Sequence, residues 1–201
     1  MTDDGSADMA NIVLIGGSLR AGSVSAQVLS ACDVLARERG ATTTVLPATE
    51  LVLPLYEPDT EVRTPNTRRL VDALVAADAL IVVTPTYHGG MSGLLKNCFD
   101  YVEDTVANRP AYLDGRAVGC VAVGWSESGA GAAVSELRHT VLSLRGWPTP
   151  MGVTINSLET SLADGVLADR RTCRRLTIML DQLCQFTGSR RAGQDALAGS
   201  S

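Results

Sequence analysis

Short apolar runs alternate with longer segments in which apolar residues recur at helical spacing. The short runs are rich in β-branched residues, which is typical of strands covered on both faces. The longer segments have the spacing of helices that bury one face. We therefore predict five strands, over Asn11–Ile15, Thr42–Leu46, Ala79–Thr84, Ala117–Val123 and Met151–Ile155.

Helices are predicted between and after these strands. Gly40 ends the first predicted helix. The second begins with Thr64 as its N-cap and Pro65 at its first helical position. The buried stripe of this second helix would be Leu70, Leu74 and Val75. The helical ranges are Ser23–Arg39, a segment opening at Thr64-Pro65, Gly93–Glu103, Ala132–Arg145 and about Asp164–Phe186.

This alternation predicts the α/β class, with a five-stranded parallel sheet and helices on both faces. Residues 11–188 would form one domain, residues 1–10 a disordered tail and residues 189–201 a flexible tail.

Composition narrows the function classes. The chain has 201 residues, a net charge of −5 and a pI near 5.0, which argues against nucleic acid as a partner. We expect no membrane association, because no apolar run reaches the roughly 18 residues of a span. The five cysteines lack metal-ligand spacing, so no metal site is predicted, and reduced thiols of a cytoplasmic protein are the simplest interpretation.

Candidate chemistry lies in the loops after the first, third and fourth strands. In an open parallel sheet, ligands bind beyond the carboxyl ends of the strands, where the strand order reverses. The three loops are Gly16–Ser25, Pro85–Ser92 and Gly124–Gly131, and all are rich in Gly and Ser. We refer to them as loops one, two and three.

Loop one has the features of an anion site. A strand, a glycine turn and a helix N-terminus aim free backbone N–H groups in one direction, and the loop adds serine hydroxyls and Arg20. Ser23 stands where a P-loop needs lysine, and the dinucleotide fingerprint G-x-G-x-x-G is absent. A monophosphate ligand remains, beside the alternative of an ordinary strand-to-helix turn capped by a serine.

Loop two is suited to a planar group. Pro85 directs the exit from the strand, and Gly89-Gly90 allow a close approach of the backbone. Tyr87 and His88 are the ring side chains placed to lie against such a group.

With both loops in view, the chain resembles the NADPH-dependent FMN reductase family of the flavodoxin-like fold. The resemblance rests on Gly17-Ser18-Leu19-Arg20-x-x-Ser23, on Pro85-Thr86-Tyr87-His88-Gly89 and on Ser92-Gly93-x-Leu95-Lys96-Asn97. It covers about residues 11–155. Ser25 is a departure, because the family usually has Asn at this position.

The resemblance assigns site residues to all three loops. The FMN phosphate would be held by Ser18, Arg20, Ser23, Val24 and Ser25. The isoalloxazine ring would be bordered by Pro85, Thr86, Tyr87, His88 and Gly89, and its pyrimidine end would be approached by loop three, with Trp125 and Ser126.

The function implied is that of an FMN-dependent oxidoreductase. NADPH or NADH would deliver a hydride to flavin N5, and a flavin, quinone or similar small molecule would accept the electrons. One alternative is a dehydrogenase that oxidises a dedicated small molecule, such as a chorismate-derived intermediate. A further alternative is a non-enzymatic flavodoxin-like electron carrier. No side chain is assigned a certain catalytic role; His88 is either a general acid or a neutral ring packed by the flavin.

The resemblance also implies a homodimer or homotetramer. Phe99, Tyr101 and Val102 would supply an interface or belong to the core, two readings that the sequence leaves open. Lys96, in a chain whose other basic residues are all Arg, either meets a need for an ammonium group at this position or stands there by chance. Glu127 is interpreted as a solvated residue rather than as a group that binds a cationic substrate. The run Arg170–Arg175 is interpreted as a solvated helix face, and the segment Pro47–Arg63 as a surface loop that carries substrate specificity.

Overall fold

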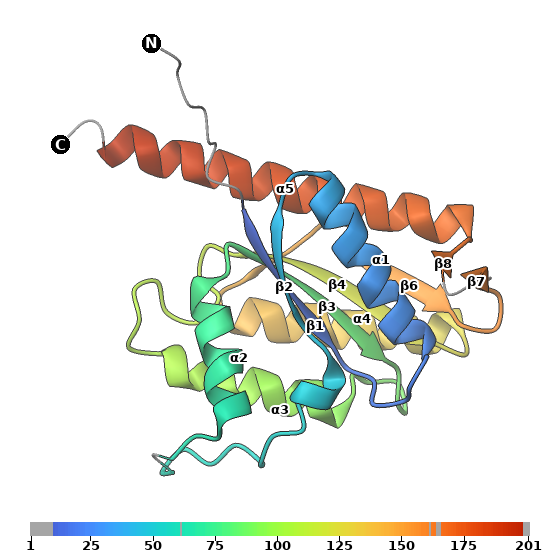
Figure 1. Ribbon diagram of the computed structural model, residues 1–201, viewed down its shortest axis with the longest axis horizontal. Coiled ribbons are helices and arrows are strands. Elements are labelled where there is room, and N and C mark those ends of the chain that lie inside the picture. Colours follow the sequence, from blue (N-terminus) through green and yellow to red (C-terminus); the bar gives the residue numbers. More distant parts are fainter. Residues whose placement is uncertain (1–9, 61, 161, 164–165, 199–201) are drawn as a thin grey trace.

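A central parallel sheet organises the computed structural model, which describes residues 10–60, 62–160, 162–163 and 166–198. The strand order is β2-β1-β3-β4, with β5 and β6 both paired to β4 (Figure 1). This order confirms the flavodoxin-like α/β class. The strands are β1 (Asn11–Gly16), β2 (Thr42–Leu46), β3 (Ala79–Pro85), β4 (Ala117–Gly124), β5 (Trp147–Pro148) and β6 (Val153–Asn156).

Helices cover both faces of the sheet. The apolar sides of α1 and α5 pack on one face, and those of α2, α3 and α4 pack on the other (Figure 1). The helices are α1 (Val24–Glu38), α2 (Pro65–Ala76), α3 (Gly93–Asp100), α4 (Glu127–Ser143) and α5 (Arg170–Ala198). Two 3-10 turns, η1 (Ala48–Glu50) and η2 (Tyr101–Thr105), and a small antiparallel hairpin, β7 (Leu162–Ala163) with β8 (Val166–Leu167), complete the elements.

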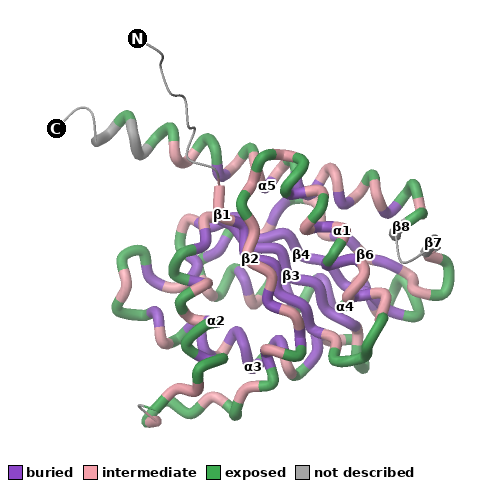
Figure 2. The backbone as a smooth tube through the Cα atoms, viewed as in Figure 1, coloured by how far each residue is buried: buried purple, intermediate pink, exposed green. Residues whose placement is uncertain are grey.

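Alternate residues of a strand belong to the apolar clusters on the two faces of the sheet. Val13 and Ile15 of β1 belong to the apolar cluster under α2 and α3, whereas Ile12 and Leu14 belong to the cluster under α1 and α5. Every residue of β3 and β4 is buried, and Figure 2 shows the two strands at the centre of the molecule. This explains why their sequences are continuous apolar runs.

The predicted N-cap of α2 is confirmed, because the Thr64 hydroxyl accepts the Thr67 N–H at 3.2 Å. At the start of α1 the Ser23 hydroxyl accepts the Ala26 N–H at 3.2 Å, as the alternative of a serine-capped turn expects. The interpretation of Val75 as an inner residue of α2 is wrong, because Leu70 and Leu74, one helical turn apart, already form the buried stripe and Val75 is turned outward.

Three other boundaries differ from the sequence prediction. Helix α4 begins at Glu127 and not at Ala132, because the Ser126 hydroxyl accepts the Gly129 N–H at 3.2 Å and caps the helix inside the expected loop. The α-helical part of the third predicted helix ends at Asp100 and continues as η2. The fifth strand begins at Val153.

The last helix is shifted along the chain. It begins at Arg170, where the Asp169 carboxylate accepts the N–H groups of Arg171 at 3.1 Å and Thr172 at 3.2 Å. The bond from the Thr172 hydroxyl contributes most to lowering the Asp169 pKa.

Helix α5 also extends through residues 189–198, which were expected to form a tail. An ion pair between Arg191 and Asp78, at 2.6 Å, ties this extension to the sheet. Of the expected N-terminal tail, residues 1–9 lie outside the described residues, as do residues 199–201 at the other end.

A buried arginine closes the amino-terminal edge of the sheet. The Arg116 guanidinium donates to the carbonyls of Ala77 at 2.8 Å, Tyr112 at 2.9 Å and Val75 at 3.0 Å. Burial is the main cause that lowers its pKa. These bonds satisfy carbonyls at the end of α2 that no helical N–H can reach.

None of the five cysteines, all of which lie in the described part of the chain, forms a disulfide. Cys32, Cys98 and Cys120 are buried, and burial raises the pKa of each to about 12. Cys173 and Cys184 are half-buried. In the described part of the chain, no helix has the length and apolar character that crossing a membrane requires.

We predict that Cys32, Cys98 and Cys120 resist alkylation in the native protein at pH 8. A pKa of about 12 leaves roughly one thiol in ten thousand as the reactive thiolate at that pH. Mass mapping after iodoacetamide treatment, with and without urea, measures this. Rapid native labelling of these three cysteines would contradict the burial described here.

Candidate functional site

The three loops meet at the carboxyl edge of the sheet, as predicted. The Gly17 N–H donates to the Val83 carbonyl at 2.9 Å, and a Cβ on Gly17 would lie 2.9 Å from the Ser92 hydroxyl, so loops one and two touch. A Cβ on Gly124 would lie 3.2 Å from the Thr86 hydroxyl, so loops two and three touch. Because β1 is flanked by β2 and β3, this contact lies at the point where strand order reverses.

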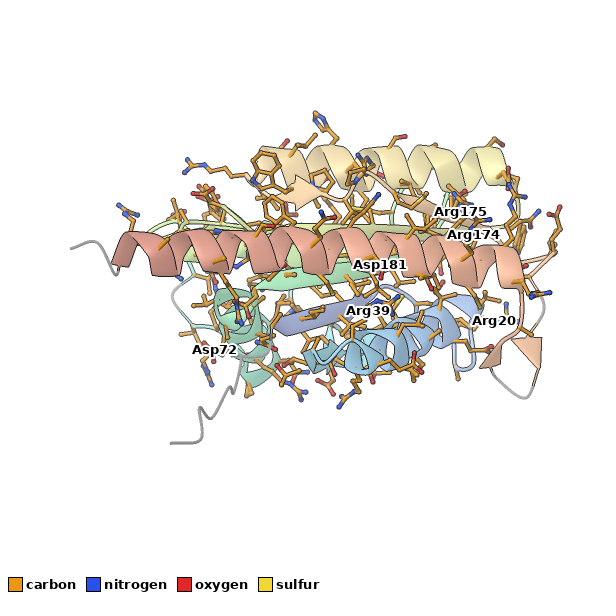
Figure 3. The ribbon with its side chains drawn as sticks, turned by 90° about the horizontal axis from the view of Figure 1, so that it is seen from above. Arg20, Arg39, Asp72, Arg174, Arg175 and Asp181 are labelled. Carbon is orange, nitrogen blue, oxygen red and sulfur yellow. The ribbon has the colours of Figure 1, made fainter. Side chains whose placement is uncertain are left out.

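Loop one closes onto the first turn of α1. The Ser23 N–H donates to the Arg20 carbonyl at 3.2 Å, and Gly22 adopts a positive φ of 64°. The side-chain amide of Gln27 donates to the Gly22 carbonyl at 3.0 Å and supports the loop from α1. Arg20 is exposed beside the start of α1 and forms no ion pair with any described residue (Figure 3).

The predicted phosphate residues occupy different depths in this loop. Ser18, Ser23 and Val24 are half-buried, and Ser25 is buried on the inner side of α1. Sequence reasoning missed Gln27, because a glutamine in the second turn of a helix carries no motif. Its bond to Gly22 supports the loop near the position where the usual asparagine is replaced by Ser25.

Loop two is a tight hairpin. Tyr87 and Gly90 exchange both backbone hydrogen bonds at 3.0 Å, and the two residues between them, His88 and Gly89, have positive φ angles of 52° and 83°. Positive φ at both central residues defines a type I′ turn. The sharp reversal leaves the Tyr87 and His88 side chains exposed at the hairpin tip.

Thr84 and Thr86 have different roles at the base of this hairpin. The Thr84 hydroxyl accepts the Ser92 N–H at 3.0 Å and donates to the Pro85 carbonyl at 2.8 Å. The Thr86 hydroxyl is buried and has no hydrogen-bond partner among the described residues. A buried hydroxyl without a partner is costly, so Thr86 offers an unused donor and acceptor to a ligand.

Loop three is shorter than predicted because α4 begins within it. Ser126 caps α4, and its hydroxyl lies 3.3 Å from that of Ser128. Trp125 is 80% exposed between the strand and this cap, and Leu158, which follows β6, is also exposed. The N-cap role of Ser126 was not predicted.

Three helices begin at this edge and favour an anionic ligand. Ser23, Ser92 and Ser126 are the N-caps of α1, α3 and α4, and each uses its hydroxyl to satisfy one backbone N–H. The remaining first-turn N–H groups carry the positive ends of the helix dipoles. The first turn of α1 holds no acidic residue that would oppose an anion.

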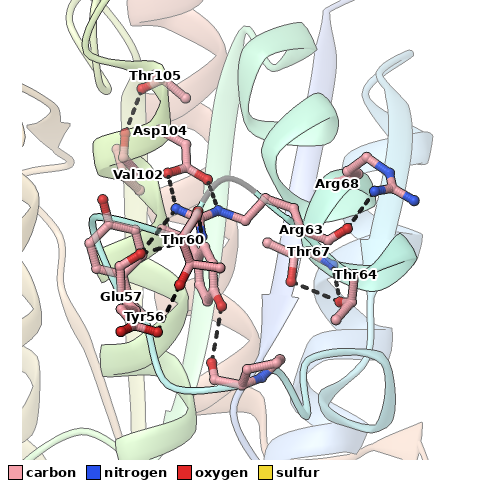
Figure 4. Close-up of polar contacts among 12 residues, drawn as sticks. Tyr56, Glu57, Thr60, Arg63, Thr64, Thr67, Arg68, Val102, Asp104 and Thr105 are labelled. Carbon is pink, nitrogen blue, oxygen red and sulfur yellow. Dashed lines mark hydrogen bonds and ion pairs between the residues drawn. The ribbon is translucent and has the colours of Figure 1, made fainter.

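The segment after β2 is fastened to α3 and η2 (Figure 4). The Arg63 guanidinium donates to both carboxylate oxygens of Asp104, at 2.7 and 2.9 Å, and lies 5.3 Å from the ring centroids of both Tyr56 and Tyr101. The hydrogen bond that Arg63 donates to Asp104 is the main cause that raises the Arg63 pKa. The side-chain Oδ1 atom of Asn97 accepts the Tyr56 N–H at 2.9 Å.

Burial and ion pairing bear on the roles of four residues that the sequence left open. Phe99, Tyr101 and Val102 are buried in the core, which settles their open interpretation against an interface. Lys96 is exposed and pairs with Asp100 one turn away on α3.

The charged residues near the start of α5 differ in their exposure to solvent and in their partners. Glu127 is exposed, and Arg171 lies 3.7 Å from it. Arg175 is not a solvated residue, because it donates to the Thr154 carbonyl at 2.9 Å and its hydroxyl at 3.2 Å on β6. Figure 3 shows Arg174 and Arg175 near the start of α5.

An open cleft of about 210 Å³ lies at the opposite edge of the sheet, lined by Asp78, Arg116, Arg190 and Arg191 among others. Arg116 and Arg191 already bind carbonyls and a carboxylate there. The three loops of the carboxyl edge contribute none of its lining residues. The cleft therefore does not belong to the candidate site.

A flavodoxin-like parallel sheet, with three loops that meet at its carboxyl edge, places the chain among flavodoxin-like α/β proteins. The sequence profile of the NADPH-dependent FMN reductase family matches residues 10–159, well over half of the chain. The protein belongs to this family.

Curated relatives include two azoreductases. The chain is 34% identical over 133 residues to the "FMN-dependent NADPH-azoreductase" of Staphylococcus haemolyticus, a match covering 64% of this chain and 66% of the relative. It is 33% identical over 128 residues to the same enzyme of Staphylococcus aureus strain USA300, covering 62% of this chain and 64% of the relative. The match thus spans slightly less than two thirds of these relatives.

Solved structures share the fold. The flavoenzyme NAD(P)H:acceptor oxidoreductase FerB of Paracoccus denitrificans superposes with a TM-score of 0.74 at 22% identity, covering 90% of this chain and 98% of FerB. The apo form of the NADH:FMN oxidoreductase EmoB gives a TM-score of 0.69 at 22% identity, covering 90% of each chain.

We predict that Arg63 and Asp104 are energetically coupled by about 1.5–3 kcal/mol, as for hydrogen bonds between charged groups. The side chains are only 15% and 20% exposed, so water screens the pair weakly. Urea unfolding of Arg63→Ala, Asp104→Ala and the double variant measures the coupling free energy. A value below about 0.5 kcal/mol would place the pair with ordinary surface ion pairs.

We predict that Thr86→Val does not destabilise the ligand-free protein and raises its free energy of unfolding by up to about 1 kcal/mol. The substitution removes a buried hydroxyl that lacks a partner and nearly conserves the side-chain volume. Thermal and urea unfolding measure the change, with Thr84→Val as the matched control. Thr84→Val should destabilise the protein, because it removes the acceptor of the Ser92 N–H.

Proposed function

We propose that this protein is an FMN-dependent oxidoreductase that takes a hydride from NADPH or NADH and reduces a small-molecule acceptor. The observation that carries the proposal is an anion-binding loop in contact with a tight hairpin that offers an unpaired buried hydroxyl. Family membership supports the cofactor, and the names of the azoreductase relatives support the direction of the reaction.

Loop one fits the phosphate of FMN. The N–H groups of the first turn of α1 and the serine hydroxyls supply donors, and Arg20 supplies a positive charge that no described carboxylate neutralises. Its guanidinium is exposed, so it can reach an incoming phosphate without breaking an existing ion pair. Ser18, Ser23, Val24 and Ser25 complete the proposed phosphate site.

Loops two and three fit the ring system. Pro85, Thr86 and the hairpin tip would border the isoalloxazine, and the Thr86 hydroxyl would gain the hydrogen bond it lacks in the protein. The start of α4, at Trp125 and Ser126, would face the pyrimidine end. The positive end of the α4 dipole would stabilise negative charge there, which favours the reduced cofactor.

The rim of the site suits a flat apolar acceptor. Each loop contributes an exposed large apolar side chain, namely Leu19, Tyr87 and Trp125. Exposed apolar groups gathered around a site mark a binding surface. An azo compound or a quinone would match them in shape and polarity.

The protein's own part in the reaction is to bind, orient and polarise. Bound FMN supplies the hydride and electron chemistry. Backbone N–H groups at the helix starts hold the cofactor, and the rim excludes water from one face of the acceptor. His88 stands at the hairpin tip, where we assign it to packing against the ring and not to general acid catalysis.

The decisive assay combines reconstitution with turnover. Apoprotein is mixed with FMN, and NADPH or NADH oxidation is followed with menadione or an azo dye as acceptor. Turnover that depends on both FMN and acceptor supports the reductase. Tight FMN binding without NAD(P)H oxidation would favour the carrier or the dedicated dehydrogenase, and absence of FMN binding would refute the flavin proposal.

We also propose that the protein forms a homodimer or homotetramer and functions in the cytoplasm. Val52, Leu55 and Val62 support assembly, because all three are exposed aliphatic side chains of the segment that follows β2. Five cysteines without a disulfide among them support a reducing compartment.

We predict that Arg20→Ala raises the dissociation constant for FMN by about tenfold to a hundredfold. Loss of a charge-assisted bond of roughly 1.5–3 kcal/mol accounts for this change. Flavin fluorescence titration measures it, and riboflavin, which lacks the phosphate, is the control ligand. Equal affinity of wild type and variant for FMN would show that Arg20 does not bind the phosphate.

A further inference from the structure

We propose that Glu136, on the third turn of α4, is a positioning residue that sets the hairpin of loop two at the correct distance from loop three for the isoalloxazine ring. This inference rests on the proposed flavin function. Glu136 lies outside the motifs of the three loops and receives no role from the family resemblance, so its role comes from the contacts alone.

The contact joins two elements distant in sequence. The Glu136 Oε2 atom accepts the N–H of Met91 at 2.7 Å, across 45 positions of the chain. A carboxylate acceptor makes this a charge-assisted hydrogen bond, which is short and stronger than a bond between neutral groups. Met91 is buried whereas Glu136 is exposed, so the bond is shielded from solvent at its amide end.

The bonded amide lies immediately beyond the hairpin. Tyr87 and Gly90 close the turn, and Met91 and Ser92 connect it to α3. The Ser92 N–H is held from β3 by the Thr84 hydroxyl at 3.0 Å. The Met91 N–H is held from α4 instead, so this bond ties the hairpin to the adjoining helix.

Gly90 makes room for the carboxylate. A Cβ at position 90 would stand 2.7 Å from the Glu136 Oε2 atom, closer than real Cβ contacts allow. The absence of a side chain at Gly90 and the carboxylate of Glu136 are therefore complementary. This gives the second glycine of the Gly89-Gly90 pair a role distinct from the positive φ angle of the first.

The bond couples the two sides of the proposed ring site. Helix α4 begins at the Ser126 cap, so its first turn is part of loop three. A rigid helix carries Glu136 from that turn to the hairpin of loop two. Without the carboxylate, the Met91 N–H loses its acceptor, and the hairpin is free to shift relative to Trp125 and Ser126.

The test uses Glu136→Ala and Glu136→Gln in the full chain. We expect Glu136→Ala to raise the dissociation constant for FMN about tenfold and to shift the visible absorption band of the bound flavin. Glu136→Gln keeps a neutral acceptor oxygen and should restore most of the affinity, to within about threefold of wild type. Ser135→Ala is the matched control, because the Ser135 hydroxyl bonds only within α4, to the Gly131 carbonyl at 2.9 Å.

A second readout needs no flavin. In the apoprotein, the Met91 amide should exchange with solvent more rapidly in Glu136→Ala than in wild type, whereas the Ser92 amide, held by Thr84, should keep its rate. Amide hydrogen exchange followed by two-dimensional NMR measures both. A purely structural role would instead lower the unfolding temperature without selective exchange at Met91 or a spectral shift of the flavin.

The outcomes separate the two proposals. If wild type binds FMN and Glu136→Ala binds it with the same affinity and spectrum, the role of Glu136 is refuted and the flavin function stands. If wild type does not bind FMN, both proposals fail. Should Glu136→Ala not fold, Glu136→Leu, which also removes the acceptor oxygens but keeps more of the side-chain volume, takes its place: a selective change at the Met91 amide with a flavin spectral shift supports the inference, and an unchanged amide and spectrum overturns it.

Discussion

The parallel pairing of β1 with β3 is the constraint on which the candidate site depends. The register runs from Ile12 opposite Ala79 to Gly16 opposite Val83, and the Gly17 N–H continues it with a bond to the Val83 carbonyl at 2.9 Å. Because β2 lies on the other side of β1, the connections after β1 and β3 run on opposite faces of the sheet. The helix that follows β1 is α1 on one face, and the helix that follows β3 is α3 on the other. Loops one and two therefore meet above neighbouring strand ends, which creates the position for a ligand between them.

The electrostatics of this edge differ from those of the whole chain. The protein carries a net charge of −5, which disfavours an anionic cofactor at long range. Three helix N-termini and the exposed Arg20 place backbone N–H donors and a positive charge at this edge, and Glu127 in the first turn of α4 opposes them in part. The amino-terminal edge has its own arginines, but Arg116 and Arg191 are occupied by carbonyls and by Asp78.

The fold was predictable because the signals that specify it are local. Apolar runs of β-branched residues predicted the strands, and Thr64 with Pro65 predicted a helix start that the structure confirms. Contacts between distant segments left no such signal. The clamp of Arg175 on β6 and the bond from Met91 to Glu136 each need the tertiary arrangement before they can be recognised. The phosphate and ring residues came from a family resemblance, and their contacts with FMN stay a prediction.

The most direct test of the account locates FMN on the protein by amide chemical-shift mapping. Apoprotein labelled with nitrogen-15 is titrated with FMN, and the shifts are followed for every assigned backbone amide. We expect the large shifts to fall in residues 17–25, 85–92 and 124–129, at the carboxyl edge of the sheet. Shifts concentrated instead at Asp78, Arg116 and Arg190, around the cleft of the opposite edge, would contradict the assignment of the three loops to the cofactor.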